Sequence, residues 1–319
     1  MDGRPNITTE FRLMRIIYPE MVAAHSAFDN VREARRSALE IGGRSKIEGS
    51  LVSLFGKSHA GKTTILEAYM EAHFPDDVDP EKPDNKRPQR KIVGITLNGD
   101  SSYLSFVKQI LRAYKDPFPG DGNADDKLER IIKYINYYKT ELLIFDEASN
   151  LRIRKATDLD ATKTHNTLRG FAKMGCPVVV AGTEEAESKI LSDGQLVSMN
   201  HDVSIKTLKQ DCAADMHLFG SYCADLGLAL KEHGLFPKRS NFVIDNTIAC
   251  LFIASGGLRG RVSRLVEHAA YIARHEDAEE VRLDHLEAAT DAYSIKNKIV
   301  THNPFRESRK TRKKETRVA

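Results

Sequence analysis

The sequence is poor in the residues and runs that characterise membrane, disulfide-bonded and zinc-binding proteins. Its 319 residues include no tryptophan and only four cysteines, none of them in a Cys-x-x-Cys pair. Such widely spaced cysteines predict buried free thiols in a reducing compartment. No apolar run approaches the roughly 20 residues of a membrane-spanning helix, and the first residues lack the apolar segment of a secretory signal. We therefore expect a cytoplasmic protein without a membrane partner.

The net positive charge of the chain comes from its last residues. The formal net charge is +3, yet residues 305–319 alone hold seven basic and two acidic residues. A basic segment with almost no apolar residues cannot form a core, so we expect a disordered tail. Two roles are open for it: contact with nucleic acid or an acidic partner, or only a contribution to solubility.

Four apolar runs predict the strands of a parallel sheet. They lack the alternation of a half-exposed strand, which is typical of sheets covered on both faces. Helical patterns lie between them, and strands that alternate with helices indicate an α/β fold. The predicted strands are 50–55, 91–97, 141–145 and 177–181, and the predicted helices are 62–74, 102–114, 126–138 and 164–174.

The strand signals end near residue 205, and the rest of the chain has helical patterns. Residues 75–90 hold four of the eleven prolines and predict an exposed loop. The expected helices of the second half are 207–233, 243–254, 258–275 and 283–296. The predicted domains are a helical N-terminal lead-in (1–44), an α/β domain (45–205), a helical domain (206–304) and the basic tail (305–319).

A phosphate-binding loop follows the first predicted strand. Residues 56–63 match the pattern G-x-x-x-x-G-K-[ST], in which glycines let backbone N–H groups turn inward around an anion. The helix that follows presents its positive end to the phosphates. We expect Lys62 to reach the β- and γ-phosphates and Thr63 to ligate Mg²⁺. The residues assigned to the nucleotide are Gly56, Lys57, Ser58, His59, Ala60, Gly61, Lys62, Thr63 and Thr64.

Polar side chains end two of the later strands. Asp146 and Glu147 follow the third run, where a carboxylate avoids burial in the sheet. We expect Asp146 to hold Mg²⁺ through its water shell and Glu147 to orient and polarise the attacking water. Thr183 ends the fourth run and is predicted to hold that water or the γ-phosphate, the alternative being a plain turn.

Arg259 opens a helix of the second domain. A cation in a first turn gains nothing from the helix dipole, so its position favours a contact with a phosphate. A solvated arginine is the alternative.

The phosphate loop, the acidic pair, the polar strand end and this arginine, in this order, resemble an AAA+ ATPase with a C-terminal helical lid. Three segments are more specific for one family of these ATPases: FDEASN (145–150), LRGFAKMGCPVVVAGTEEA (168–186) and SDGQL (192–196). They resemble the TniB/TnsC family of transposition ATPases, as do GGLRGRVSRLVEHAA (256–270) and NPF (303–305). The resemblance covers roughly residues 10–305.

The resemblance implies ATP and Mg²⁺ as cofactors and hydrolysis as an assembly switch. It also implies sequence-independent binding of double-stranded DNA, self-assembly into a ring or helical filament, and nucleoid association. The implied protein partners are a transposase and a TniQ-like target-selection protein. The family roles fall on Lys62, Thr63, Asp146, Glu147, Thr183 and Arg259.

One position departs from the family pattern. Met199 stands where relatives often carry an arginine that can reach a neighbouring subunit's nucleotide. Either another cation serves this role or hydrolysis is weak until a partner helps. The other candidates are Arg152, Arg154, Lys155 and Lys189.

The DNA contacts are less legible in the sequence. Affinity for duplex DNA comes mainly from lysines and arginines, and hydroxyls at a helix start also hold phosphates. For each candidate, a solvated surface residue is the alternative. The candidates are Ser101, Ser102, Tyr103, Lys108, Arg152, Arg154 and Lys155, and the pair Tyr18-Pro19 is a guess for adenine.

Three other functions share parts of this pattern. An AAA+ helicase loader or protein-remodelling ATPase would also use the lid and the tail. A signalling NTPase usually carries repeat domains downstream. A small-molecule kinase would need a substrate pocket and a closing lid beside the phosphate loop.

Overall fold

The computed structural model describes residues 4–41, 48–73, 90–99, 102–151 and 159–307, with side chains of the last range from residue 162 onward. Contacts divide the chain into two units. The helical unit comprises Met1–Tyr18, His59–Gly61 and Lys206–Ala319, and the sheet unit comprises Pro19–Ser58 and Lys62–Ile205. The N-terminal lead-in is thus shared between both units.

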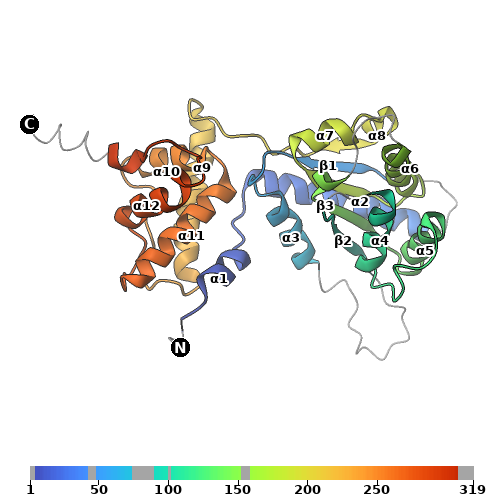
Figure 1. Ribbon diagram of the computed structural model, residues 1–319, viewed down its shortest axis with the longest axis horizontal. Helices are drawn as coiled ribbons and strands as arrows, with labels where there is room; N and C mark the ends of the chain where they lie inside the picture. Colours follow the sequence, from blue (N-terminus) through green and yellow to red (C-terminus); the bar gives the residue numbers. More distant parts are fainter. Residues whose placement is uncertain (1–3, 42–47, 74–89, 100–101, 152–158, 308–319) are drawn as a thin grey trace, which may run out of the picture. The chain divides into compact units, whose positions relative to one another are not determined.

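Five parallel strands form the centre of the sheet unit (Figure 1). Their order is β2-β3-β4-β1-β5. The four predicted strands are confirmed within one residue at every end, because each is a short apolar run. The fifth was not predicted, since this three-residue edge strand contains no apolar residue. The strands are β1 (Leu51–Phe55), β2 (Ile92–Thr96), β3 (Leu142–Asp146), β4 (Val178–Gly182) and β5 (Asn200–Asp202).

Helices cover both faces of this sheet, as the uninterrupted apolar runs predict. On one face, α4, α5 and α6 share a core with alternate strand residues such as Phe145 and Val180. On the other face, α2 and α3 contact β3. The helices are α2 (Pro19–Glu40), α3 (Lys62–Ala72), α4 (Tyr103–Ala113), α5 (Ala124–Tyr137), α6 (Leu159–Lys173), α7 (Glu184–Ile190) and α8 (Gly194–Ser198), with a 3-10 turn η2 (Ala148–Asn150).

A buried ion pair joins α2 to the start of β3. Arg32, 1% exposed, donates to Glu141 Oε2 from Nε at 3.2 Å and from Nη2 at 2.9 Å. Its Nη1 donates to the Tyr69 hydroxyl of α3 at 3.1 Å, and that hydroxyl donates to Asp29 at 2.7 Å. The hydrogen bonds satisfy both buried charges, as such a pair requires.

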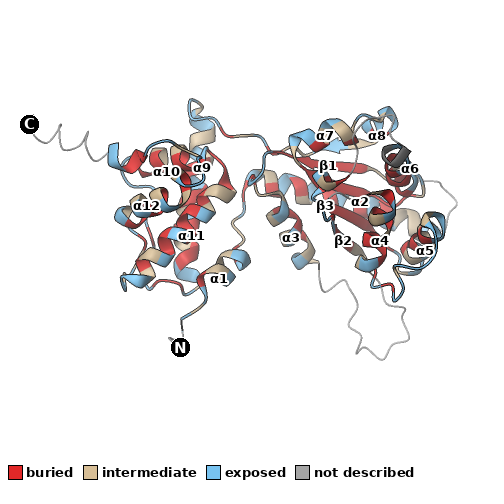
Figure 2. Cartoon of the chain, viewed as in Figure 1, coloured by how far each residue is buried: buried red, intermediate tan, exposed pale blue. Residues whose placement is uncertain are grey.

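The helical unit is built around α11, which contacts α1, α9, α10 and α12. Figure 2 shows buried residues, in red, along its helices, and α11 has the buried face that packs against its neighbours. The predicted helix 283–296 is divided, because a π-helix follows α12. Among the described residues, every helix is too short or too polar to cross a bilayer. The elements are α1 (Ile7–Leu13), α9 (Ala213–Glu232), α10 (Thr247–Ser255), α11 (Arg259–His275), α12 (Leu283–Ala289) and the π-helix η3 (Thr290–Ile295).

Residues 305–307, the start of the expected disordered tail, are instead held on the helical unit. Residues 304–307 form a helical turn. Phe305 is buried, and Arg306 pairs with Glu287 and Asp291. An apolar side chain and an ion-paired arginine thus hold this segment on the helical unit. Residues 308–319, the rest of the predicted tail, lie outside the described residues.

Candidate nucleotide-binding site

The carboxyl ends of three neighbouring strands meet at one edge of the sheet. Phe55 of β1 pairs with Gly182 of β4, and Phe145 of β3 pairs with Val180 of β4. The Gly56 N–H donates to the Gly182 carbonyl at 3.3 Å, which closes the edge between β1 and β4. In open α/β sheets this edge is where ligands bind. It carries the phosphate loop, the acidic pair and the polar residue after β4.

Lys62, the first residue of α3, turns its side chain back toward the start of the phosphate loop. Its ammonium donates to the carbonyls of Gly56 and Lys57, each at 2.9 Å. Burial lowers the pKa of Lys62, and the negative charges of Asp146 and Glu147 partly offset this shift. An ammonium held beside the loop backbone at a helix N-terminus is suited to bind phosphate.

The bend of the loop needs unusual backbone angles at two residues. His59 has φ 64° and Gly61 has φ 102°, both in the region that glycine adopts without strain. A Cβ on Gly61 would lie 2.6 Å from the Tyr18 hydroxyl, so this position requires glycine twice over. His59 in turn accepts a hydrogen bond at its carbonyl from the Gly260 N–H at 3.0 Å. Both contacts belong to the helical unit.

Thr63 and Asp146 form the pair predicted to hold Mg²⁺. The Thr63 hydroxyl donates to Asp146 Oδ2 at 2.9 Å, across the edge between α3 and β3. Hydroxyl and carboxylate oxygens, with water and phosphate, are the ligands that Mg²⁺ prefers. The donor set therefore fits a magnesium–nucleotide complex. Thr64 is half-buried next to it on α3.

Glu147 has a strained backbone. It lies just beyond β3 with φ 56° and ψ 39°, the left-handed conformation, and its N–H donates to Asp146 Oδ1 at 2.8 Å. A non-glycine residue in this conformation costs free energy and is often found at functional sites. The bend leaves the Glu147 side chain exposed at the strand end while the Asp146 carboxylate stays buried. Of the two acids, Glu147 is therefore exposed and Asp146 is buried.

Thr183 is connected to the turn after β3 by Ser149, a residue that was not singled out in the sequence. The Ser149 hydroxyl lies 3.0 Å from the Thr183 hydroxyl and accepts the Thr183 N–H at 3.1 Å. The neighbouring Asn150 donates to the Leu97 carbonyl at 2.7 Å, which anchors the same turn on β2. The only sequence signal was a run of polar residues directly after the acidic pair.

Arg259 is buried within the helical unit, so the solvated alternative is wrong. It is 4% exposed, and its guanidinium lies 4.5 Å from the ring centroid of Tyr18. The position of Arg259 over this ring is cation–π geometry. Tyr18 also packs edge-on against Tyr222, whose hydroxyl is 2.7 Å from that of Ser263. A phosphate contact of Arg259, and the assignment of adenine to Tyr18, stay predictions.

Tyr103 is the DNA candidate that the structure contradicts. Its side chain is buried, and its hydroxyl lies 2.9 Å from that of Thr167 on α6, so the ring belongs to the core. Ser102 caps α4 by accepting the Ser105 N–H, and Lys108 is half-buried on the same helix. The other candidates lie outside the described residues: Ser101, Arg152, Arg154 and Lys155.

The cation expected to act on a neighbouring subunit is not identified by contacts. Lys189, the candidate within the described part of the chain, pairs with Glu185 at 2.7 Å on the surface of α7. Met199 caps α8 with its backbone, and its carbonyl accepts the Leu51 N–H at 3.0 Å. Met199 therefore has a structural place at the sheet edge.

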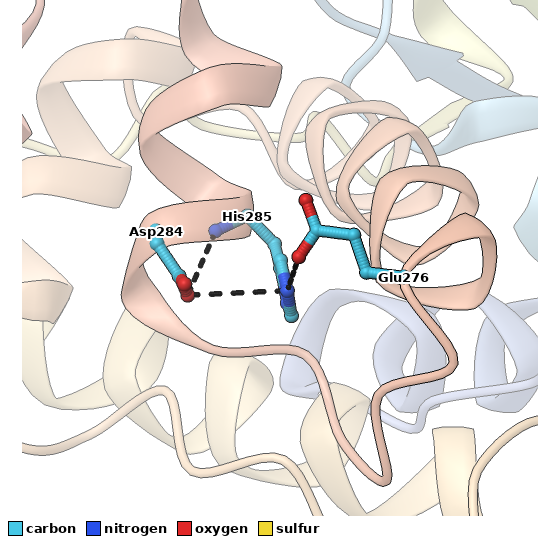
Figure 3. Close-up of side chains that lie close together, drawn as sticks. All are labelled: Glu276, Asp284 and His285. Atoms are coloured by element: carbon cyan, nitrogen blue, oxygen red, sulfur yellow. Dashed lines mark hydrogen bonds and ion pairs between the residues drawn. The ribbon is translucent and has the colours of Figure 1, made fainter.

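A second cluster, in the helical unit, has the residue types of a metal site, but both ring nitrogens of its histidine are engaged in hydrogen bonds. Glu276, Asp284 and His285 lie together between the end of α11 and the start of α12 (Figure 3). His285 Nδ1 accepts the Arg282 N–H at 2.9 Å, so the neutral ring carries its proton on Nε2 and donates to Glu276 at 3.1 Å. A metal ion at Nε2 would displace the proton from that nitrogen. The proton of the neutral ring would then lie on Nδ1, which could no longer accept the Arg282 N–H that caps α12. The cluster is therefore a helix cap.

The fold resembles solved structures of origin-recognition and Cdc6 proteins. ORC2 of Aeropyrum pernix (ADPNP–ADP complexes) matches with a TM-score of 0.56 and 15% identity, over 88% of this chain and 71% of that one. Cdc6p of Pyrobaculum aerophilum matches at 0.58 and 14%, over 88% and 69%. ORC1 of A. pernix, solved with DNA, matches at 0.54 and 15%, over 89% and 69%. At such identities the similarity establishes the fold, that of the AAA+ ATPases.

The sequence itself matches one family. No curated protein matched in the comparison of full sequences. The model of the bacterial TniB proteins matches residues 14–209, which is more than half of the chain and includes the phosphate loop, the acidic pair and Thr183. The chain therefore belongs to the TniB family and has the AAA+ fold with a helical C-terminal unit.

Proposed function

We propose that this protein is a Mg²⁺-dependent ATPase that assembles on double-stranded DNA when ATP is bound and recruits a transposase. One observation carries the ATPase part. Lys62, the pair Thr63–Asp146 and the exposed Glu147 come together at the carboxyl edge of a parallel sheet. The TniB family supports the part that concerns transposition.

Each residue of the edge has a separate role in this proposal. Lys62 and the loop amides bind the phosphates, and Thr63 and Asp146 hold the magnesium, which would neutralise charge on the β- and γ-phosphates. Glu147 orients the attacking water and takes up its proton. Thr183, positioned by Ser149, fixes the water or the γ-phosphate from the neighbouring strand. Arg259 is proposed to contact a phosphate from the helical unit.

The partners are proposed from the family and from chemistry. They are double-stranded DNA, further copies of the chain in a ring or filament, a transposase and a TniQ-like target-selection protein. DNA binding is expected to be independent of sequence, since backbone contacts by lysines, arginines and hydroxyls supply it. ORC1 of A. pernix, a protein of the same fold, was solved with DNA. Hydrolysis would then release the assembly.

A second candidate is an AAA+ loader or remodelling ATPase, favoured by the likeness to Cdc6 and origin-recognition proteins. The ATPase rate separates the two. The proposed function requires that double-stranded DNA alone change the rate, whereas a loader would respond to its protein partner and not to DNA alone.

Glu147→Gln tests the proposed switch. The amide keeps the size of the side chain but cannot accept the proton, so hydrolysis should fall at least about a hundredfold. ATP affinity should stay near that of the parent. Complexes on duplex DNA, followed by sedimentation with ATP and Mg²⁺, should persist long after those of the parent have dissociated.

Release of DNA by this variant as fast as by the parent would contradict the role given to Glu147. Glu185→Gln is a matched control, because Glu185 is an exposed acid on the neighbouring α7 that pairs only with Lys189 in the contacts described. It should hydrolyse ATP and leave DNA at the parent rate.

A further inference from the structure

An apolar pocket opens in the sheet unit between α4, α5 and α6. Its volume is about 330 Å³, which lies in the range of pockets that hold small ligands or large side chains. It includes none of the residues assigned to the nucleotide. Its apolar lining comprises Tyr103, Leu128, Ile132, Gly170, Phe171 and Met174.

The pocket suits an apolar ring rather than a polar group. The Tyr103 hydroxyl is already engaged by Thr167, so the interior offers little hydrogen-bonding demand. Among the described residues, no atom outside the neighbouring backbone of α6 lies within 4 Å of the position that a Cβ on Gly170 would take, which leaves space at the wall. Two charged side chains, Lys163 and Asp125, also line the pocket; both are exposed, and the Lys163 ammonium lies 5.7 Å from the ring centroid of Tyr103.

Phe118 is an apolar ring on the surface of the same unit. Its side chain is 63% exposed, and it is the only exposed phenylalanine among the described residues. It begins a β-turn, in which the Asp121 N–H donates to the Phe118 carbonyl at 3.1 Å. Pro117 and Pro119 flank it and restrict the backbone. A large aromatic ring held on a restricted loop can serve as an anchor that a partner pocket buries.

The loop that carries Phe118 is held by a buried cation. Lys127 of α5 is fully buried, and its ammonium donates to the carbonyls of Gly120 at 3.0 Å and Asp121 at 2.9 Å, and also to that of Gly122. Arg130 donates to the Phe118 carbonyl at 3.1 Å. The loop is thus organised before any partner binds, so docking of the ring costs little conformational entropy.

Phe118 and the pocket lie on opposite sides of α5. The loop is bound by positions 127 and 130, whereas positions 125, 128 and 132 line the pocket. With about 100° per residue, the two sets point roughly 160° apart around the helix axis. Phe118 therefore cannot enter the pocket of its own chain.

The charges around the ring complement those at the pocket rim. Lys115 and Asp121, both exposed, lie within three residues of Phe118. The rim offers Asp125 and Lys163. Each surface thus presents one cation and one anion beside an apolar centre, and opposite charges can pair when the two surfaces meet.

We propose that Phe118 of one copy inserts into the α4–α5–α6 pocket of a second copy. The donor and acceptor surfaces differ, so the contact is heterologous, and its repetition lines copies up in an open chain or a large ring. This interface goes beyond the proposed function, because it uses neither the nucleotide edge nor DNA. It supplies a contact by which assembled copies hold one another.

Cysteine cross-linking of the full chain tests the contact. The half-buried Cys212 is first changed to serine; the other three cysteines are buried. One preparation then carries Asp121→Cys, which keeps the Phe118 ring, and another carries Lys163→Cys at the pocket rim; the two are mixed under mild oxidation without nucleotide or DNA. We expect a disulfide-linked dimer to form at least about tenfold faster than with Val197→Cys in place of Lys163→Cys, since Val197 is exposed on α8 outside the pocket.

Two further variants report on assembly without cysteine. Phe118→Ala removes the anchor and Gly170→Leu fills the pocket, so each should raise the concentration needed for self-association about tenfold. Both should keep the ATP affinity of the parent. Cross-linking no faster than with the Val197 control, or unchanged self-association of both variants, would overturn the proposal. The proposed function is judged separately, by whether the parent assembles on duplex DNA with ATP and Mg²⁺.

Discussion

Glu147 and Ser149 show how single residues shape the end of β3. The left-handed backbone at Glu147 turns the chain sharply, and two residues later the Ser149 hydroxyl lies 3.0 Å from that of Thr183, directly after the neighbouring strand β4. The turn therefore couples the proposed general base to the proposed water-positioning residue. Such coupling is worth most in the transition state, where small displacements of the water slow the reaction.

Ser149→Ala should slow hydrolysis without weakening nucleotide binding. It removes two hydrogen bonds to Thr183, each worth roughly 1 kcal/mol, so the turnover rate should fall by up to about thirtyfold. The ATP dissociation constant should change less than about twofold, because the phosphates are bound elsewhere. Measured turnover and ATP titration separate the two effects. Equal losses in both would show that Ser149 acts by holding the fold of the edge.

At this scale, the local part of the site was predictable and the non-local part was not. The phosphate loop and the acidic pair are written in consecutive residues, so the sequence locates Lys62 and Asp146 directly. Ser149 was missed because its partner, Thr183, is 34 residues away. Tyr103 was misassigned to DNA because nothing in the local sequence shows that α6 covers its ring.

The helix α2 carries a buried ion pair to the start of β3. This helix has a weakly apolar face and is tied to β3 through Arg32 and Glu141, both buried. A buried ion pair adds little net stability over an apolar pair, but the loss of one partner leaves an uncompensated charge. The position of α2 on the sheet therefore depends on both residues being present.

Arg32→Ala should destabilise the sheet unit by about 3–5 kcal/mol. The double variant Arg32→Met/Glu141→Leu should recover most of this loss, because no buried charge remains. Arg36→Ala is the control: Arg36 lies 3.6 Å from the same carboxylate but is 44% exposed, so it should cost less than about 1 kcal/mol. The free energy of unfolding in urea checks all three. A double variant as unstable as Arg32→Ala would contradict the electrostatic explanation.

The elements themselves were largely predictable. Short apolar runs located four strands and 3.6-residue periods located most long helices, because burial dictates both patterns. The predictions failed where burial gives no pattern. The edge strand β5 is polar, and the segment 304–307 looked like the start of a basic tail although Phe305 and Arg306 attach it to the helical unit.

At the scale of the whole molecule, nucleotide bound at one edge of the sheet is proposed to control assembly on DNA. Family and fold are established by the TniB match and by the likeness to AAA+ structures. The sequence indicated both, but it could not reveal the docking surface, because Phe118 and its pocket are brought to opposite sides of α5 only by folding. Assembly would then combine a nucleotide-controlled step with a contact between copies.

Lys62→Ala, compared with the parent by sedimentation on duplex DNA with ATP and Mg²⁺, tests the central claim most directly. Loss of the ammonium that faces the loop should abolish ATP binding, and with it the large DNA-bound assemblies. Lys133→Ala, an exposed lysine of α5, should behave like the parent. The account predicts that Lys62→Ala sediments without DNA-bound assemblies, and it is contradicted if this variant binds no ATP yet clusters on DNA as the parent does.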